Sequence, residues 1–392
     1  MADQHGLTVI LLAPANSVHV RRWASALGAR GHRVIVASWT AGETIAGAEV
    51  QVAPAAGSNP TWRLALAYQW LRRLVDESAA DLVHVHSLGM YGLLSLALPV
   101  RPARVVSPWG SELVAARHSA FRAAVTRRAL HSADLALPTS SAVAAELTRR
   151  YALPPGRVRV LSWGVEDALI EMRSRVQADA ARAEFGLPAE ATIVLSCRTT
   201  SATYRTREIV SAFVDAAKFR ADLFLVLVRG RQPEHTARGR AQDEYLREIR
   251  QLLRRVANRT MLVEDILEPA QLFRLMCASN LAVSAPASDQ RSSSVLEAAL
   301  AGCRLLLSDI PPYRELVHDG LAADLAAEPL ASTLARMLTT VSSETISQQR
   351  NMRFILSQER ATDKAEILDG IYRQVACAAH VYAARNLDLP RE

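Results

Sequence analysis

Residues 7–39 read LTVILLAPANSVHVRRWASALGARGHRVIVASW and set out a strand, a helix and a second strand. Residues 7–13 form an apolar run of strand length, residues 19–31 have the mixed character of an amphipathic helix, and residues 32–39 form another apolar run. Strand-length runs that alternate with helix-length segments are typical of βαβ units with parallel strands. The opening stretch therefore predicts an α/β fold.

The same alternation continues along most of the chain. Further strand-length runs occupy residues 81–87, 103–109, 133–140 and 158–165, and after a break at 163–176 five more follow at 191–197, 221–230, 259–265, 280–286 and 303–309. We predict two doubly wound Rossmann-like domains that face a cleft, over residues 1–165 and 166–370. An amphipathic helix over 371–392 is expected to pack on one or both domains. In such sheets ligands bind beyond the carboxyl ends of the strands.

Composition narrows the class of protein. The chain has 392 residues, of which 50% are hydrophobic and 22% charged, as in soluble proteins. It has no uninterrupted apolar run of about 18 residues, so no transmembrane helix is predicted. The four cysteines are widely spaced and form no CxxC pair, which argues against a disulfide framework or a zinc site and favours a reducing, cytoplasmic location.

Positive charge is concentrated in the first part of the chain. Residues 1–160 contain 17 Arg against 9 Asp plus Glu, a balance of +8, whereas the remainder contains 29 Lys plus Arg against 30 acids. Residues 1–165 also hold all six tryptophans. A basic half suggests an anionic or lipid-linked substrate, or peripheral contact with the inner face of a membrane. A solvated basic face with a small-molecule substrate is the alternative.

Residues 288–302, SDQRSSSVLEAALAG, place polar groups between a buried strand and a helix. A helix N-terminus presents unpaired amides and a partial positive charge, which suit a phosphate. Asp289 and Glu297 supply hydrogen-bond acceptors on either side, so the stretch fits a nucleotide-sugar. The alternative is a capping box, in which Ser294 and Glu297 satisfy the helix amides themselves.

Two strand ends in the first domain carry further candidates. Alternation along DLVHVHS places His84 and His86 on one face. His86, nearer the carboxyl end, is the candidate site residue, and His84 is expected to be a hydrogen-bonded core residue. Asn16, Ser17 and His19 follow the first strand, where backbone amides can bind an anion or where Asn16 or Ser17 can act as an N-cap.

These motifs together resemble retaining GT-B glycosyltransferases of family 4. Residues 288–302 resemble the acid-x7-acid motif of that family, with Asp289 and Glu297 as the two acids. The stretches that resemble its other segments are APANSVHVRRWASALGARGHRVIVAS (13–38), LVHVHSLGMYG (82–92), VVSPWGSE (105–112) and LLLSDIPPYRELVHDG (305–320). The likeness covers nearly the whole chain in the right order.

The resemblance implies roles for the second domain, which would bind the nucleotide-sugar. Glu297 would hold the donor ribose, Asp289 the hydroxyls of the transferred sugar, and the amides around Ser292, Ser293 and Ser294 the distal phosphate.

The first loop of that domain departs from the family pattern. An Arg and a Lys usually clamp the diphosphate there. LSCRTTSATYRTRE keeps the Arg as Arg198, whereas Tyr204 stands where the Lys is expected and Arg205 follows it. A tyrosine can hydrogen-bond a phosphate but cannot neutralise it. Either Arg205 substitutes for the Lys or the clamp is weaker.

The first domain would bind the acceptor, and it also departs from the family. Trp109 stands where the family often places a His near the reacting carbon. Trp109 could stack on a sugar or a base, with core packing as the alternative. Glu112 could position or deprotonate the acceptor hydroxyl, and His86 could also line the catalytic site.

The resemblance implies transfer of a hexose-like group from a nucleoside diphosphate sugar, such as a UDP-sugar, to a small-molecule, sugar or lipid-linked acceptor, with retention. No metal, organic cofactor or nucleic-acid partner is expected. A nucleotide-sugar epimerase and an inactive glycosyltransferase-like binding protein are the alternatives. A Rossmann dehydrogenase and a P-loop NTPase are disfavoured because the chain has neither G-x-G-x-x-G after its first strand nor a Walker motif.

Overall fold

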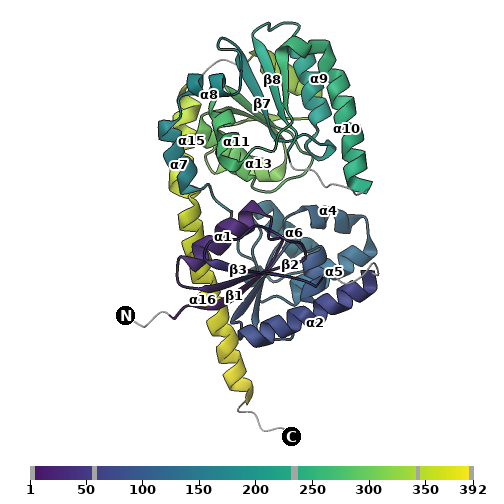
Figure 1. Ribbon diagram of the computed structural model, residues 1–392, viewed down its shortest axis with the longest axis vertical. Coiled ribbons are helices and arrows are strands. Elements are labelled where there is room, and N and C mark those ends of the chain that lie inside the picture. The colour runs from purple at the N-terminus through teal and green to yellow at the C-terminus, as the bar shows by residue number, and fades with distance from the viewer. Residues whose placement is uncertain (1–4, 55–59, 231–236, 341–344, 388–392) are drawn as a thin grey trace. The chain divides into compact units, whose positions relative to one another are not determined.

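The computed structural model describes residues 5–54, 60–230, 237–340 and 345–387. These residues form two compact units (Figure 1). The N-terminal unit comprises Met1–Trp163 and Thr362–Glu392, and the C-terminal unit comprises Gly164–Ala361.

The N-terminal unit is built on a six-stranded parallel sheet in the order β3-β2-β1-β4-β5-β6. Its strands are β1 (Thr8–Leu12), β2 (Arg33–Ser38), β3 (Ala48–Val52), β4 (Leu82–His86), β5 (Ala103–Ser107) and β6 (Leu135–Ala136). Its helices are α1 (Val18–Gly28), α2 (Pro60–Ser78), α3 (Met90–Ser95), α4 (Ser111–Arg117), α5 (Ala120–His131), α6 (Ser141–Tyr151) and the 3₁₀ turn η1 (Pro155–Arg157).

The C-terminal unit repeats this plan in the order β12-β11-β10-β7-β8-β9, again with parallel pairs. Its strands are β7 (Thr192–Thr199), β8 (Leu223–Val228), β9 (Thr260–Val263), β10 (Leu281–Ser284), β11 (Arg304–Ser308) and β12 (Asp324–Ala326). Its helices are α7 (Asp167–Arg175), α8 (Ala178–Glu184), η2 (Ala202–Tyr204), α9 (Thr206–Ala216), α10 (Ala237–Leu253), η3 (Arg254–Arg259), α11 (Pro269–Cys277), α12 (Ser293–Ala301), α13 (Pro311–His318), α14 (Leu330–Thr340) and α15 (Thr345–Gln358).

Each sheet is covered by helices on both faces, and each face has its own hydrophobic core (Figure 1). The central strands are almost wholly apolar because they are buried on both sides. The strand order runs outward in both directions from β1 and β4 in one unit and from β7 and β10 in the other. The two doubly wound α/β domains predicted from the sequence are confirmed.

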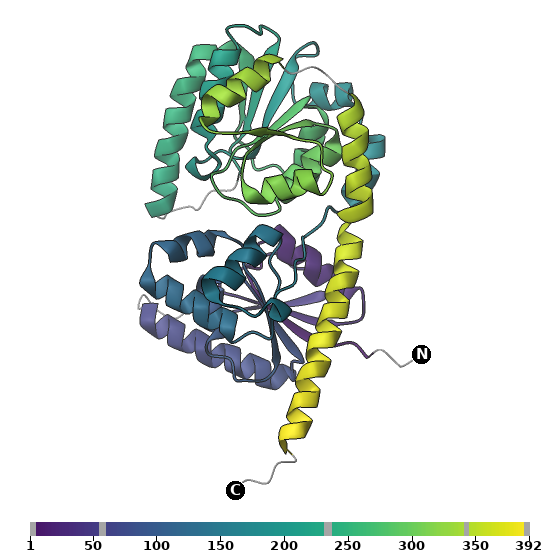
Figure 2. The same ribbon diagram turned by 180° about the vertical axis from the view of Figure 1, so that it is seen from behind.

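The last helix, α16 (Ala361–Leu387), packs on the N-terminal unit (Figure 2). Leu368 and Tyr372 lie in the core between this helix and the sheet. Asp369 accepts a hydrogen bond from the buried His32 ring at 2.9 Å, which ties the helix to the start of β2. The helix begins ten residues before the predicted range of 371–392, and residues 388–392 lie outside the described residues. No helix in the described part of the chain is long and apolar enough to cross a membrane.

Residues 158–165 form no strand, so that prediction was wrong. Only Val158 and Val165 make single bridge contacts, to Ala136 and Arg360. The segment is apolar because Leu161 and Trp163 are buried in the core that α16 completes. An apolar run of this length is equally compatible with a buried loop, which periodicity does not distinguish from a strand.

Candidate functional site

The predicted donor-binding residues lie at the switch point of the C-terminal sheet. Arg198 is near the end of β7, and Asp289 and Ser292 follow β10. These two parallel strands are hydrogen-bonded neighbours at the centre of the sheet, so their carboxyl ends meet at one edge. The chain leaves them in opposite directions, and doubly wound proteins bind their ligands at such a switch point.

Arg198 is the centre of a polar network at this edge. Its Nη1 lies 2.9 Å from Asp289 Oδ2 and also donates to the Ser292 hydroxyl. Its Nη2 donates to the Tyr204 hydroxyl at 2.6 Å, and the guanidinium lies 4.2 Å from the centre of the Tyr204 ring. Burial lowers the pKa of Arg198, but the raising effects of Asp289, Tyr204 and Tyr313 together outweigh burial and leave the pKa above its usual range. The network therefore keeps a fixed positive charge at the sheet edge.

Arg205 and its neighbour Tyr204 contact different residues. Its guanidinium pairs with Glu208 at 3.2 Å and with Glu328. Its backbone is left-handed, with φ of 51°, which separates its direction from that of Tyr204. The structure thus brings Tyr204 to Arg198 and holds Arg205 in ion pairs outside the network. The diphosphate-binding role predicted for either residue stays a prediction.

The N-terminus of α12 is not capped by a side chain of its own segment. The N-cap is Ser292, whose side chain makes no capping hydrogen bond because its hydroxyl accepts from Arg198. The capping box of Ser294 and Glu297 is not formed, since the helix begins at Ser293, earlier than that motif requires. The Ser293 hydroxyl has no hydrogen-bond partner within the described residues. Amides and hydroxyls of the first turn are therefore placed as a phosphate would need them.

The charges of Glu297 and Asp289 both raise the pKa of one neighbouring thiol, that of Cys197. Glu297 lies half-buried on α12. Burial raises the pKa of Cys197 to about 12, against the effect of Arg198, and the charges of Asp289 and Glu297 raise it further. The two carboxylates therefore both lie close to the end of β7. Cys197 stays protonated and is unsuited to act as a nucleophile.

In the N-terminal unit, β4 places two histidines in an aromatic cluster. The His84 and His86 rings are 4.0 Å apart, on the same face of the strand as predicted. His84 is the hydrogen-bonded core residue expected, with Tyr372 at Nδ1 and Ser107 at Nε2. His86 is fully buried, and neither of its ring nitrogens has a hydrogen-bond partner among the residues that the structure describes.

Burial, together with the charge of His19, lowers the pKa of His86 to about 3 from its ordinary 6.5. At a pH between about 3 and 6.5, His86 binds a proton in the unfolded chain but not in the folded chain. The free energy of unfolding is therefore highest above pH 6.5 and falls as the pH drops below that value. We expect His86 to cost about 2 kcal/mol of unfolding free energy between pH 7.5 and pH 5. Urea unfolding of His86→Asn should show a weaker pH dependence by this amount. Replacement of the exposed His118 by Asn should leave the wild-type dependence, and an unchanged slope in His86→Asn would contradict the assignment.

Glu112 joins the loops that follow β4 and β5. Its carboxylate accepts the backbone N–H of Trp109 at 2.5 Å and of Leu88 at 3.1 Å. Burial raises the pKa of Glu112, and these backbone hydrogen bonds partly offset that effect. The geometry shows Glu112 fixing the loop that carries Trp109. Direct contact of Glu112 with an acceptor stays a prediction.

Trp109 and the residues after β1 border the same aromatic cluster. Trp109 is half-buried and lies edge-on to His86, with ring centres 6.3 Å apart. His19 stacks on Trp163 at 4.7 Å. Ser17 is the N-cap of α1 but makes no side-chain capping bond, and Asn16 is exposed. These residues sit at the carboxyl ends of β1, β4 and β5, beside the switch point of this sheet.

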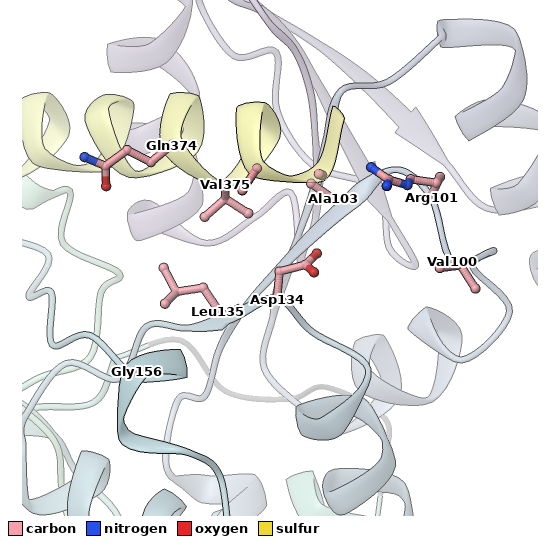
Figure 3. A pocket seen from close by; sticks show the side chains of 10 residues that line it. Val100, Arg101, Ala103, Asp134, Leu135, Gly156, Gln374 and Val375 are labelled. Carbon is pink, nitrogen blue, oxygen red and sulfur yellow. The ribbon is translucent and has the colours of Figure 1, made fainter. Parts of the chain in front are cut away.

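A pocket of about 450 Å³ lies elsewhere on the N-terminal unit (Figure 3). Its walls come from the starts of β5 and β6 and from α16, and they include Arg101, Ala103, Asp134 and Val375. It is therefore at the amino edge of the sheet, opposite the strand ends described above. None of the predicted site residues lines it.

Sequence reasoning missed two residues at these sites. Tyr313 contacts Asp289, although it lies in a quoted stretch, and Trp23 packs against both His86 and Trp163. A tyrosine hydroxyl needs a partner when buried, but burial itself was not readable from the pattern.

Among the described residues no group of three His, Cys, Asp or Glu side chains is arranged to hold a metal ion.

Two doubly wound parallel domains of the same strand order define the GT-B architecture, as predicted. Residues 17–169 match the model of a family described as Glycosyltransferase Family 4, so the resemblance to family 4 seen in the sequence is confirmed for this part of the chain. No curated protein sequence matches the chain.

Solved structures are similar over nearly the whole chain. Sucrose-phosphate synthase from Thermosynechococcus elongatus has a TM-score of 0.79 at 17% identity, covering 95% of this chain and 100% of its own. HepE from Anabaena in complex with UDP has a TM-score of 0.74 at 15% identity, covering 94% and 100%. WaaG, a glycosyltransferase involved in lipopolysaccharide biosynthesis, has a TM-score of 0.72 at 17% identity, covering 93% and 99%. At these identities the likeness shows the fold alone.

Proposed function

We propose that the chain is a retaining glycosyltransferase that moves a sugar from a nucleoside diphosphate sugar to a hydroxyl or amine of a small-molecule or lipid-linked acceptor. The family match of the N-terminal residues and the GT-B fold support the class. The observation that carries the donor assignment is the Arg198–Asp289–Ser292 network at the start of α12. The comparisons offer no support for an epimerase.

In this proposal the leaving diphosphate binds the first amides of α12, with Arg198 and Tyr204 beside it. Departure of the diphosphate leaves an oxocarbenium-like sugar and concentrates negative charge on the leaving group. Preorganised donors stabilise such charge because they need no reorientation during the reaction. Asp289 would accept hydrogen bonds from the sugar hydroxyls, and Glu297 from the ribose. The departing phosphate would take the acceptor proton, so the proposal requires neither a metal nor a protein nucleophile.

The acceptor side of the proposal rests on the N-terminal unit. His86, Trp109 and Glu112 are the proposed acceptor-side residues, and Asn16, Ser17 and His19 are the proposed anion-binding loop. An anionic or lipid-linked acceptor, with peripheral membrane contact, matches the basic charge of this part of the chain. A uridine diphosphate sugar is the first donor to test, because the similar HepE structures contain UDP and UDP-glucose.

Turnover of UDP-, GDP-, TDP- and ADP-glucose, with and without candidate acceptors, tests the function. We expect one donor to be consumed and the anomeric configuration to be retained in the product, as read by proton NMR of its anomeric coupling. An inverted product would contradict the retaining mechanism. Binding of a donor with no transfer or hydrolysis under any condition would instead indicate a binding protein.

A further inference from the structure

Tyr313, on α13, has a buried hydroxyl between two groups at the donor edge, the carboxyl ends of β7 and β10 with Arg198, Asp289 and Ser292. The side chain is fully buried. Its hydroxyl lies 2.8 Å from the Ser284 hydroxyl at the end of β10 and 2.8 Å from Asp289 Oδ2. Nothing in the sequence pattern singles out this tyrosine, and the function proposed above assigns it no role.

The direction of these hydrogen bonds follows from the acceptor. An ionised carboxylate only accepts, so the single proton of the Tyr313 hydroxyl is donated to Asp289, and Ser284 donates to Tyr313. Burial raises the pKa of Tyr313 well above its ordinary value, and the charge of Asp289 raises it further. The phenol therefore stays protonated and remains a donor throughout the working pH range.

Asp289 is held by donors on both of its oxygens. Oδ2 accepts from Tyr313 and lies 2.9 Å from Arg198, while Oδ1 accepts from the backbone N–H of Gln290 at 2.8 Å. Arg198 belongs to the diphosphate side of the network and Gln290 to the loop itself. Tyr313 thus ties the carboxylate to α13 and to the end of β10, independently of the contact that Arg198 makes from β7.

We propose that Tyr313 is a positioning residue that orients Asp289 toward the hydroxyls of the transferred sugar. This inference rests on the proposed function. Loss of a residue that serves the sugar alone lowers the affinity for the intact nucleotide-sugar. It leaves the affinity for the nucleoside diphosphate unchanged, because in the proposed function the diphosphate is bound by α12 and Arg198.

Tyr313→Phe removes the donor and keeps the ring. Isothermal titration with UDP-glucose and with UDP should show about a ten-fold loss of affinity for UDP-glucose and less than a two-fold change for UDP. Tyr245→Phe is the matched control, because the Tyr245 hydroxyl also makes a hydrogen bond in this unit, which it accepts from the Arg207 backbone N–H at 2.9 Å. It should alter neither affinity by more than two-fold. Equal losses for both ligands, or no loss for either, would overturn the proposal.

A double-mutant cycle separates this inference from the proposed function. In an Asp289→Ala background, Tyr313→Phe should cause no further loss of UDP-glucose affinity, and additive losses would overturn the positioning role. If the wild-type protein binds no nucleotide, the proposed function fails. The same cycle measured by thermal unfolding of the unliganded protein then decides whether Tyr313 acts through Asp289, since independent shifts in Tm would contradict the coupling.

Discussion

Arg198→Ala is expected to lower kcat/KM for the nucleotide-sugar by about 100- to 1000-fold. Arg198 contacts Asp289, Ser292 and Tyr204, so its removal releases these groups and takes away the positive charge that would face the leaving diphosphate in the proposed reaction. Tyr204 cannot replace that charge, and Arg205 is held by Glu208 and Glu328. The measurement is initial rate against donor concentration with saturating acceptor.

The matched control for this prediction is Arg274→Ala. Arg274 also makes an ion pair in the C-terminal unit, with Glu184 at 2.9 Å, but on the surface of α11 and away from the donor edge. It should retain near wild-type kcat/KM. Thermal unfolding of both variants establishes that they fold. Turnover of Arg198→Ala within ten-fold of wild type would show that the diphosphate binds elsewhere.

Arg291→Met should destabilise the C-terminal unit by about 3–5 kcal/mol. The Arg291 side chain is only 8% exposed and pairs with Glu359 and Asp319, each at 2.9 Å, and with Glu315 at 3.7 Å. Replacing the cation leaves three carboxylates facing one another, of which Glu359 is almost wholly buried. Removal of one partner of a buried ion pair costs more than the pair contributes, because the remaining buried charge loses the cation that compensates it.

Urea unfolding at pH 7 measures this loss. Arg304→Met provides the comparison, since Arg304 pairs with the more exposed Asp324 at 2.8 Å and should cost about 1 kcal/mol or less. A loss below 1 kcal/mol for Arg291→Met would show that the three carboxylates are solvated. Arg291 belongs to the loop between β10 and α12, so its variant should also weaken donor binding.

The elements that could be predicted are those with local apolar periodicity. The central strands, buried on both faces, read as continuous apolar runs, and these runs placed Arg198 near the end of the right strand and Asp289 and Ser292 after the right strand. The edge strand β3, with the sequence AEVQV, and the three-residue β12 are only partly buried and carry no such run. Both were missed for that reason.

Contacts between distant segments could not be predicted from one sequence. The pairing of Arg291 with Glu315, Asp319 and Glu359 joins the loop between β10 and α12 to α13 and to the residue after α15. The return of α16 to the N-terminal unit depends on long-range contacts such as that of His32 with Asp369. Local pattern reports which face of an element is apolar, but not which element covers it.

We propose that a nucleotide-sugar binds at the start of α12, with Glu297 on its ribose. Titration of UDP-glucose into the wild-type protein and into Glu297→Ala tests this proposal, with Glu248→Ala on the outer helix α10 as a folded control. We predict an affinity at least about ten-fold weaker for Glu297→Ala, because loss of a charged hydrogen-bond acceptor costs roughly 1.5–3 kcal/mol. The Glu248→Ala variant should bind as the wild type does. Equal affinity of Glu297→Ala and wild type would place the nucleotide away from α12 and contradict the account.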